Sequence, residues 1–251
     1  KPLLYELIAQ GFVDYDEDES KIIVKDKLLH YVKANARKVD YDGLRITSNT
    51  DSTNATLNLK NNELTATGIK FIEFSPVQKV AIIPDDGKII VKENRDMTID
   101  GKLFAGYSVM EGKGFNFNYD EYNINLDSVE IFDLFVPTGR LDENNEPESI
   151  KLGSSLEGLN GVLLIDAPSN KSGKEDIEVF PSFQSKKNSY VYYERPETQE
   201  GVYKRDSFYF ELDKFSFNHL DRFTPRDVKF KGKLVSSDIF EPFEEELLIR
   251  K

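Results

Sequence analysis

The residues best suited to acid–base chemistry in this sequence are His219 and Asp221, which are separated by one residue. A histidine beside a carboxylate is the arrangement of a general base and the group that orients it. No nucleophile motif accompanies the pair, since Gly-x-Ser-x-Gly is absent. The other histidine, His30, falls in a predicted helix, where it faces solvent or partners the helix C-terminus. We therefore predict a chain that is not an enzyme and has no catalytic residues.

Two groups of acidic residues have the composition of cation sites. Asp14, Asp16 and Asp18 have the spacing of a calcium loop, but an EF-hand also needs glycine at position six and a carboxylate at position twelve. Those positions hold Glu19 and Lys25, so the segment is interpreted as a solvated hairpin tip. The second group shares one polar loop, and such a charged loop is more typical of a soluble surface; it comprises Asp142, Glu143, Glu146 and Glu148. We predict no metal site.

The segment Ser169–Gly173 resembles part of a phosphate-binding loop. A Walker A motif needs two glycines separated by four residues, followed by lysine, between a strand and a helix. Neither that spacing nor a Gly-x-Gly-x-x-Gly fingerprint is present. The segment is interpreted as a flexible loop, and no cofactor is predicted.

An aromatic-rich zone is the one candidate ligand face. Exposed aromatic rings can stack on sugars, with neighbouring Asp and Asn binding hydroxyl groups. The alternative is that rings at strand spacing fill a β core, and the absence of Trp weakens a sugar platform. The residues of this possible ligand face are Tyr190, Tyr192, Tyr193, Tyr203 and Tyr209.

The composition excludes several classes of protein. The 251 residues include no Cys and two His, so disulfide frameworks, thiolate chemistry and zinc ribbons are ruled out. A net charge of −12 argues against a nucleic-acid surface. No apolar run reaches the ~18 residues of a transmembrane helix. The chain is also read as a piece of a longer protein, so the lack of a leader says nothing about its compartment.

The elements that position these residues are predicted to differ between the two ends. Residues 1–40 predict a small α/β cap: a short helix ending near Gly11, a hairpin across Asp16–Ser20, and a helix over Lys27–Arg37 with Asp26 as its N-cap. Residues 41–251 show short alternating segments bounded by Asn, Asp, Gly or Pro. They predict an antiparallel β domain, either an elongated sandwich or an open, curled sheet.

Details of the β domain follow from its glycines and turn residues. Thr98–Met110 is predicted as one strand with glycine-marked bends, Glu111–Gly114 as a turn, and Pro137–Pro147 as a polar loop. Ile150–Leu159 is weakly patterned and could hold a helical turn.

Two hairpins of similar pattern are predicted near residues 98–126 and 207–236. Phe115, Phe117 and Tyr119 are followed by an Asp turn and a second apolar strand, and Phe208, Phe210 and Leu212 repeat that order. A duplicated hairpin and convergent β patterning both explain the echo.

Several segments resemble the repeat-bearing regions of very large β-rich envelope proteins of Gram-negative bacteria. The resemblance spans nearly the whole chain and is carried by Gly11–Tyr41, Lys92–Gly106, Phe115–Leu126, Lys171–Gly173, Asn188–Tyr192, Gly201–Asp206 and Lys231–Phe240. The C-terminal segment Phe230–Leu248 is also similar to the closing repeats of AsmA-like envelope proteins. The resemblance implies a bacterial, periplasmic or extracellular fragment of a longer protein, and it implies no catalytic residue.

Three functions are carried forward. The first is a non-catalytic structural or interaction module whose partners are other domains of the same larger protein or envelope proteins. The second is a carbohydrate-binding or carbohydrate-active module. The third is a segment of a conduit for apolar ligands such as lipids.

Overall fold

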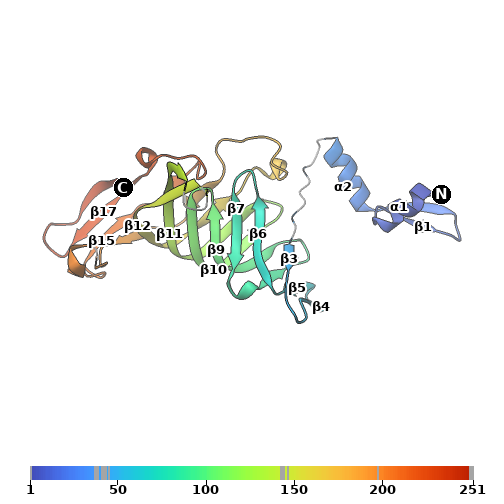
Figure 1. The fold of residues 1–251 in the computed structure, drawn as a ribbon, viewed down its shortest axis with the longest axis horizontal. Helices are drawn as coiled ribbons and strands as arrows, with labels where there is room; N and C mark the ends of the chain where they lie inside the picture. The colour runs from blue at the N-terminus through green and yellow to red at the C-terminus, as the bar shows by residue number, and fades with distance from the viewer. Residues whose placement is uncertain are drawn as a thin grey trace.

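The chain folds into a small N-terminal unit, a two-stranded hairpin with one helix before it and one after it, followed by one large sheet. The computed structural model describes residues 2–36, 40, 44, 46–141, 145, 147–196 and 198–248. Within them, one sheet has two strands and the other has sixteen, and all of the strand pairs are antiparallel. Figure 1 shows the first unit at one end of the molecule and β17 at the other. The predicted mainly β fold, with an open sheet and a small N-terminal α/β cap, is confirmed.

The N-terminal unit, residues 2–36, contains the elements that the sequence predicts. They are α1 (Pro2–Ala9), β1 (Val13–Asp16), β2 (Lys21–Val24) and α2 (Asp26–Asn35). The predicted N-cap is off by one residue, because Lys25 occupies that position and makes no side-chain cap, so Asp26 lies in the first turn. The negative charge of Asp26 in the first turn still stabilises the helix by interacting with the positive end of its dipole.

The large sheet is ordered β18-β17-β15-β14-β12-β11-β10-β9-β7-β6-β3, with β4, β5, β8, β13 and β16 branching from this path. Its strands are β3 (Ile46–Ser48), β4 (Ala55–Asn58), β5 (Glu63–Ala66), β6 (Ile69–Ser75), β7 (Val80–Pro84), β8 (Ile89–Val91), β9 (Met97–Ala105), β10 (Ser108–Asn118), β11 (Asn123–Leu141), β12 (Pro147–Leu164), β13 (Ser182–Ser185), β14 (Ser189–Tyr192), β15 (Phe208–Leu212), β16 (Ser216–Phe217), β17 (Lys229–Ser236) and β18 (Phe243–Leu248).

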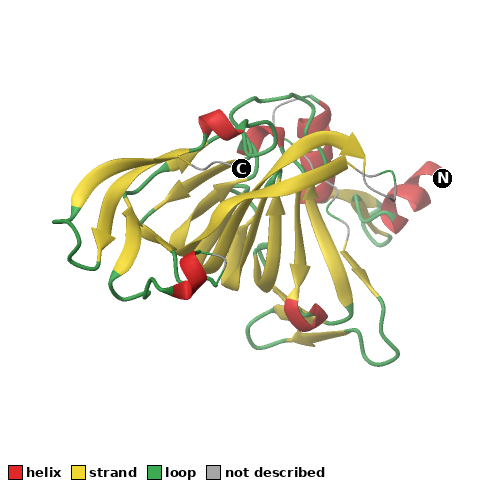
Figure 2. Cartoon of the chain, turned by 60° about the vertical axis from the view of Figure 1, so that its left-hand side comes forward, coloured by secondary structure: helices red, strands yellow, loops and turns green. Residues whose placement is uncertain are grey.

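Two strands change neighbours along their length, and this splits the sheet. The start of β9 pairs with β8, whereas its second half pairs with β7. The end of β12 pairs with β13, whereas its middle pairs with β14. Both divergences turn part of the sheet away from its mean plane, and Figure 2 shows the long strands bending over the structure. The result is a curled sheet with free edges.

The curl encloses the hydrophobic core on one face of the sheet. Phe74 of β6 and Phe117 of β10 touch at 4.6 Å between ring centroids, although β7 and β9 separate their strands in the sheet. The Tyr122 hydroxyl donates to the Phe74 carbonyl at 2.7 Å across the same gap. A second run of ring contacts links Phe132, Phe183, Phe215, Phe230, Phe217, Phe223 and Tyr107.

Three buried strand glycines make room for those rings. A Cβ on Gly161 would lie 2.6 Å from the Phe183 ring, and one on Gly232 would lie 2.6 Å from Phe210. A Cβ on Gly112 would meet Phe115 at 3.1 Å. Each also faces a carbonyl oxygen of a neighbouring strand at 2.1–2.4 Å, so these positions exclude every larger residue.

The predicted strand Thr98–Met110 is wrong as a single element. The chain reverses at Gly106 and Tyr107, so β9 and β10 form a hairpin with a two-residue turn. The predicted turn Glu111–Gly114 instead lies inside β10, where the register shifts on both sides of Gly112. Glycines mark both features, but the tight turn lies at Gly106, where a bend is predicted, and the bulge lies at Gly112, where a turn is predicted.

Two other predictions fail because β11 and β12 are unusually long. Ile150–Leu159 belongs to β12 rather than to a helical turn, and β11 extends to Leu141, well into the predicted loop Pro137–Pro147. Register shifts interrupt the alternation in both strands, which hides their period of two. Asp142, Glu143 and Glu146 lie outside the described residues.

The two echoed segments adopt different structures. The first is a hairpin, in which Phe115–Asn118 pairs with Asn123–Leu126. In the second, β15 pairs with β14 and β17, while β16 pairs with β13. Similar apolar spacing therefore does not mark a repeated hairpin here.

Gly106 ties the β9–β10 turn to the loop after β16. Its φ is +57°, and a Cβ there would lie 2.3 Å from the Leu220 carbonyl oxygen and 2.4 Å from the Asp221 nitrogen. We expect Gly106→Ala to lower the free energy of unfolding by about 3 kcal/mol, the sum of left-handed strain and overpacking. Denaturant unfolding followed by circular dichroism measures the change.

Gly114→Ala is the matched control, because Gly114 also has a left-handed φ, +66°, but no atom within 4 Å of the added Cβ. We expect a cost of about 1 kcal/mol from backbone strain alone. Equal costs at both positions would show that the close approach at Gly106 does not matter.

Candidate functional site

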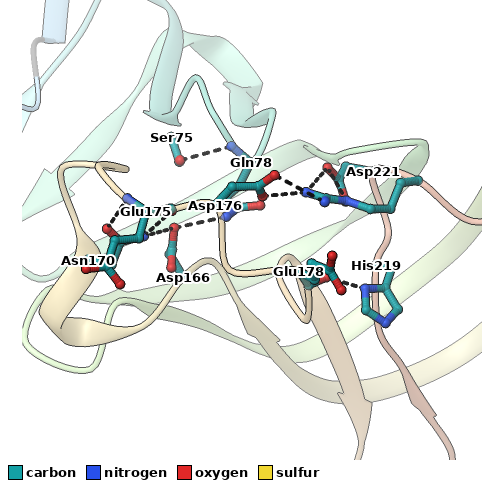
Figure 3. Close-up of polar contacts among 10 residues, drawn as sticks. Ser75, Gln78, Asp166, Asn170, Glu175, Asp176, Glu178, His219 and Asp221 are labelled. Carbon is teal, nitrogen blue, oxygen red and sulfur yellow. Dashed lines mark hydrogen bonds and ion pairs between the residues drawn. The ribbon is translucent and has the colours of Figure 1, made fainter.

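Three segments distant in sequence meet in a polar cluster that is buried at Gln78, Asp166 and Asn170. They are the turn between β6 and β7, the loop after β12 and the loop after β16, whose polar contacts are drawn in Figure 3. Sequence reasoning could not bring them together, because Gln78 and Asp166 are 88 residues apart.

Asp166 is the centre of this cluster. Its carboxylate is 2% exposed and accepts hydrogen bonds from Gln78 Nε2 and Asn170 Nδ2, each at 3.0 Å, and from the Ala167 nitrogen at 2.7 Å. Asn170 in turn holds the backbone of Glu175 through both ends of its amide. The donors are neutral amides, so this buried carboxylate works as a structural clamp on the loop.

Arg222 gathers the other carboxylates of the cluster. Its guanidinium lies 2.8 Å from Asp176 Oδ1 and 3.0 Å from Asp221 Oδ2. The hydrogen bond from Arg222 lowers the pKa of Asp176 below its ordinary value. The ion pair is therefore complete above that ordinary pKa and weakens only as the pH falls through the lowered one.

The candidate acid–base pair does not assemble. The ring of His219 contacts the carbonyl oxygen of Glu178 through Nδ1, whereas the Asp221 carboxylate is bound by Arg222. His219 has a left-handed φ of +57°, and its backbone nitrogen donates a hydrogen bond to the Val179 carbonyl. Both side chains fix the loop in place rather than face one another.

The Ser169–Gly173 segment binds a carboxylate of this same chain. Asp40 accepts hydrogen bonds from the Ser172 nitrogen at 2.5 Å and from the Ser172 hydroxyl at 2.8 Å. The donors that a phosphate loop would offer to its ligand are here used by an internal acid.

The five tyrosines of the possible ligand face lie on two faces of the sheet. Tyr190, Tyr192 and Tyr209 point away from the core and are half-buried, with ring centroids 5.8–6.2 Å apart. We call these three the tyrosine shelf. Tyr193 and Tyr203 instead pack against Phe208 at 5.7 and 4.0 Å, on the core side.

Arg205 covers part of the tyrosine shelf and was not predicted. Its guanidinium lies 3.7 Å from the Tyr192 ring centroid and pairs with Glu157 at 2.5 Å and Glu194 at 2.8 Å. These carboxylates raise the pKa of Arg205, and burial raises the pKa of Tyr192. The shelf is thus an aromatic surface with a cation over the Tyr192 ring and charged, hydrogen-bonding groups at its side.

The acidic segments considered as cation sites show ordinary surface contacts where they are described. Asp16 accepts from the Glu19 nitrogen and Asp14 pairs with Lys25, as in a solvated hairpin tip. Glu148 accepts from the Thr138 hydroxyl. Among described residues, no three His, Cys, Asp or Glu side chains cluster as metal ligands, and no helix is long and apolar enough to span a membrane.

The N-terminal unit carries many exposed large hydrophobic side chains. Val13 is the one buried hydrophobic residue in the described stretch 2–36. Ile22, Ile23 and Val24 are 50–55% exposed on β2. We define the apolar surface of the N-terminal unit as Leu3, Tyr5, Ile22, Ile23, Val24, Leu29 and Val32.

Comparisons with known proteins give no match. No protein-family model, no curated protein and no solved structure is detectably similar to this chain. The resemblance to Gram-negative envelope proteins, and to AsmA-like proteins at the C-terminal end, therefore remains a prediction.

The sequence alone predicts part of where these site residues lie. The period of two already separates Tyr192 from Tyr193, since neighbouring strand residues face opposite sides. The sequence predicts that Ile22–Val24 lies in a hairpin. It does not predict that these side chains are exposed, because exposure depends on which other parts of the fold pack against them. No sequence signal points to Arg205 or Gln78, because Glu157 and Asp166, which they contact, lie 48 and 88 residues away in the chain.

The clamp around Asp166 predicts a large cost for its removal. Asp166→Ala leaves the buried amide nitrogen of Gln78 without its acceptor and takes one of two acceptors from Asn170 Nδ2, so we expect the free energy of unfolding to fall by about 3 kcal/mol. Denaturant titration followed by circular dichroism gives the value.

Asp176→Ala is the control, since it removes an exposed carboxylate from the same loop. We expect a much smaller shift of the midpoint, because exposed ion pairs contribute little. If both variants shift the unfolding midpoint by the same amount, the buried Asp166 carboxylate contributes no more to stability than the exposed Asp176 carboxylate.

Proposed function

We propose that this chain is a non-catalytic interaction module in which the sheet is the scaffold and the N-terminal unit is the docking element. The observation that carries the proposal is the apolar surface of the N-terminal unit. Eight large hydrophobic side chains are exposed on α1, β2 and α2, and seven of them make up the apolar surface defined above. A unit of this size buries too little surface to be stable without support, and a partner that covers these side chains supplies it.

The filled interior of the sheet supports a scaffold. Leu103, Met110, Leu126, Phe183 and Leu212 on the core face have no exposed area. Side chains closed to a water-sized probe leave no room beside them for an acyl chain, so this packing favours a scaffold over a conduit for apolar ligands.

The polar cluster supports a role without catalysis. Asp166, Asp176 and Asp221 are each bound by amide or guanidinium groups of this chain, and the His219 ring is bound by a backbone carbonyl. Groups committed to internal partners are poorly placed to exchange protons with a substrate. A place in the bacterial envelope, as part of a larger protein, follows from the resemblance alone and belongs to the same proposal.

Carbohydrate binding at the tyrosine shelf is the second candidate. Three half-buried rings lie beside the Arg205 ion pairs with Glu157 and Glu194. If this surface binds glycans, Tyr192→Ala and Tyr209→Ala will each abolish the signal on a glycan array. Tyr203→Phe, on the core side, will leave it unchanged, and no binding by the intact chain at millimolar sugar would exclude this candidate.

Site-specific photocrosslinking tests the docking role. Benzoylphenylalanine in place of Leu29, in the cells that make the protein, is expected to give a discrete adduct. Ile22→Ser with Val32→Ser should reduce its yield by more than tenfold, because each buried aliphatic side chain contributes about 1.5–3 kcal/mol.

The control places the same probe at Leu59, which is exposed at the tip of the β4–β5 hairpin. We expect no discrete adduct there. Absence of any adduct from position 29, or an adduct insensitive to the two Ser substitutions, would contradict the proposed docking role.

A further inference from the structure

We propose that the N-terminal unit of one molecule docks on the C-terminal edge of the sheet of a second copy, with β2 adding as an antiparallel strand to β18. This inference deepens the proposed function, since it rests on the N-terminal unit being the docking element, and it names the partner. It is carried by two unpartnered strands whose residue order is complementary.

The receiving strand is β18, at the end of the large sheet. It pairs with β17 on one side and has no partner strand on the other within the described residues. At six residues it is longer than β3 or β4, which end the sheet elsewhere. A free strand of this length offers backbone donors and acceptors to an added strand.

The added strand is β2. It pairs only with β1 among the described strands, and Ile22, Ile23 and Val24 are all about half exposed. Successive side chains of a strand face opposite sides, so β2 is apolar on both faces. That pattern is typical of a strand covered on both faces inside a sheet, not of a free edge.

Charge and apolarity fix the orientation. Along β2 the apolar run Ile22–Val24 precedes Lys25, whereas along β18 the acidic run Glu244–Glu246 precedes Leu247 and Leu248. An antiparallel register sets Val24 beside Leu247, Ile23 beside Leu248 and Lys25 beside Glu246. A parallel arrangement would bring the acidic turn Asp16–Glu19 toward Glu244.

The existing contacts of these charges allow the exchange. Lys25 pairs with Asp14 at 2.9 Å, and Glu246 lies 4.0 Å from Lys229. Both pairs are exposed and contribute little, so their rearrangement is inexpensive. On the outer face, Lys231 of β17 already lies opposite Glu246 of β18, so Lys25 on the other side of Glu246 extends an alternation of charge across the strands.

The two strands belong to different copies. Figure 1 places the N-terminal unit and the β17 end at opposite ends of the long axis. Contact between unlike surfaces is head-to-tail, so it generates open chains of molecules, or rings where the rotation between copies closes. The strand contact is small, and association is expected to be weak in dilute solution.

Disulfide trapping tests the register, because the chain contains no cysteine of its own. Ile23→Cys and Leu248→Cys, made in separate molecules of different tagged size, are mixed under mild oxidation. We expect a mixed disulfide at about tenfold the yield obtained with Leu57→Cys, which replaces a similarly exposed residue on the β4 edge. The double variant in one chain should give a ladder of dimers, trimers and longer species.

A charge exchange separates docking from damage to the edge. Glu246→Lys should lower the yield of mixed disulfide, and Lys25→Glu in the other molecule should restore it. A frayed β18 would not be rescued in this way. Failure of the rescue would therefore overturn the assigned contact.

Other products would also overturn the proposal. A disulfide joining two Ile23→Cys molecules would indicate pairing between two N-terminal units. A closed monomer from the double variant would indicate docking within one chain, and no product would indicate no contact. If photocrosslinking at Leu29 captures a different protein while trapping fails, the docking role stands and the second copy is excluded as its partner.

Discussion

The architecture depends on aromatic rings being able to lie directly over glycine in the sheet. Gly112, Gly161 and Gly232 have the rings of Phe115, Phe183 and Phe210 where a side chain would stand. That proximity lets the core face close on itself, so Phe74 reaches Phe117 across two intervening strands. A sheet without those gaps would hold its rings farther apart and bury less of them.

Because the core face is filled, interactions with other molecules fall to the rest of the surface. The polar cluster holds three connecting segments together through Asp166 and Arg222. The outer face carries the tyrosine shelf, and the ends carry unpaired strands and the apolar surface of the N-terminal unit. The surfaces suited to contact with other molecules therefore lie mainly at the two ends of the molecule.

Local patterns predicted the fold class, since alternation and turn residues are properties of neighbouring residues. The helices and the hairpin of the N-terminal unit form where the sequence predicts them. Where a bulge shifts the register, as in β10 to β12, the alternation changes phase, and the local pattern predicts a turn, a loop or a helical turn in place of a strand. The candidate sites were harder to predict, since Arg205 pairs with Glu157 of β12, 48 residues away in the chain, and Gln78 binds Asp166 from 88 residues away.

The short turns between β9, β10, β11 and β12 have a consequence for the order of events during folding. Each of these strands pairs with the one next to it in the chain, so closing the meander requires little loop entropy. The β12–β14 pairing spans a longer connection, and β15, β17 and β18 follow it outward. We expect the meander to form the nucleus and the C-terminal strands to add in turn, so the edge offered by β18 exists only on molecules that have already completed their core.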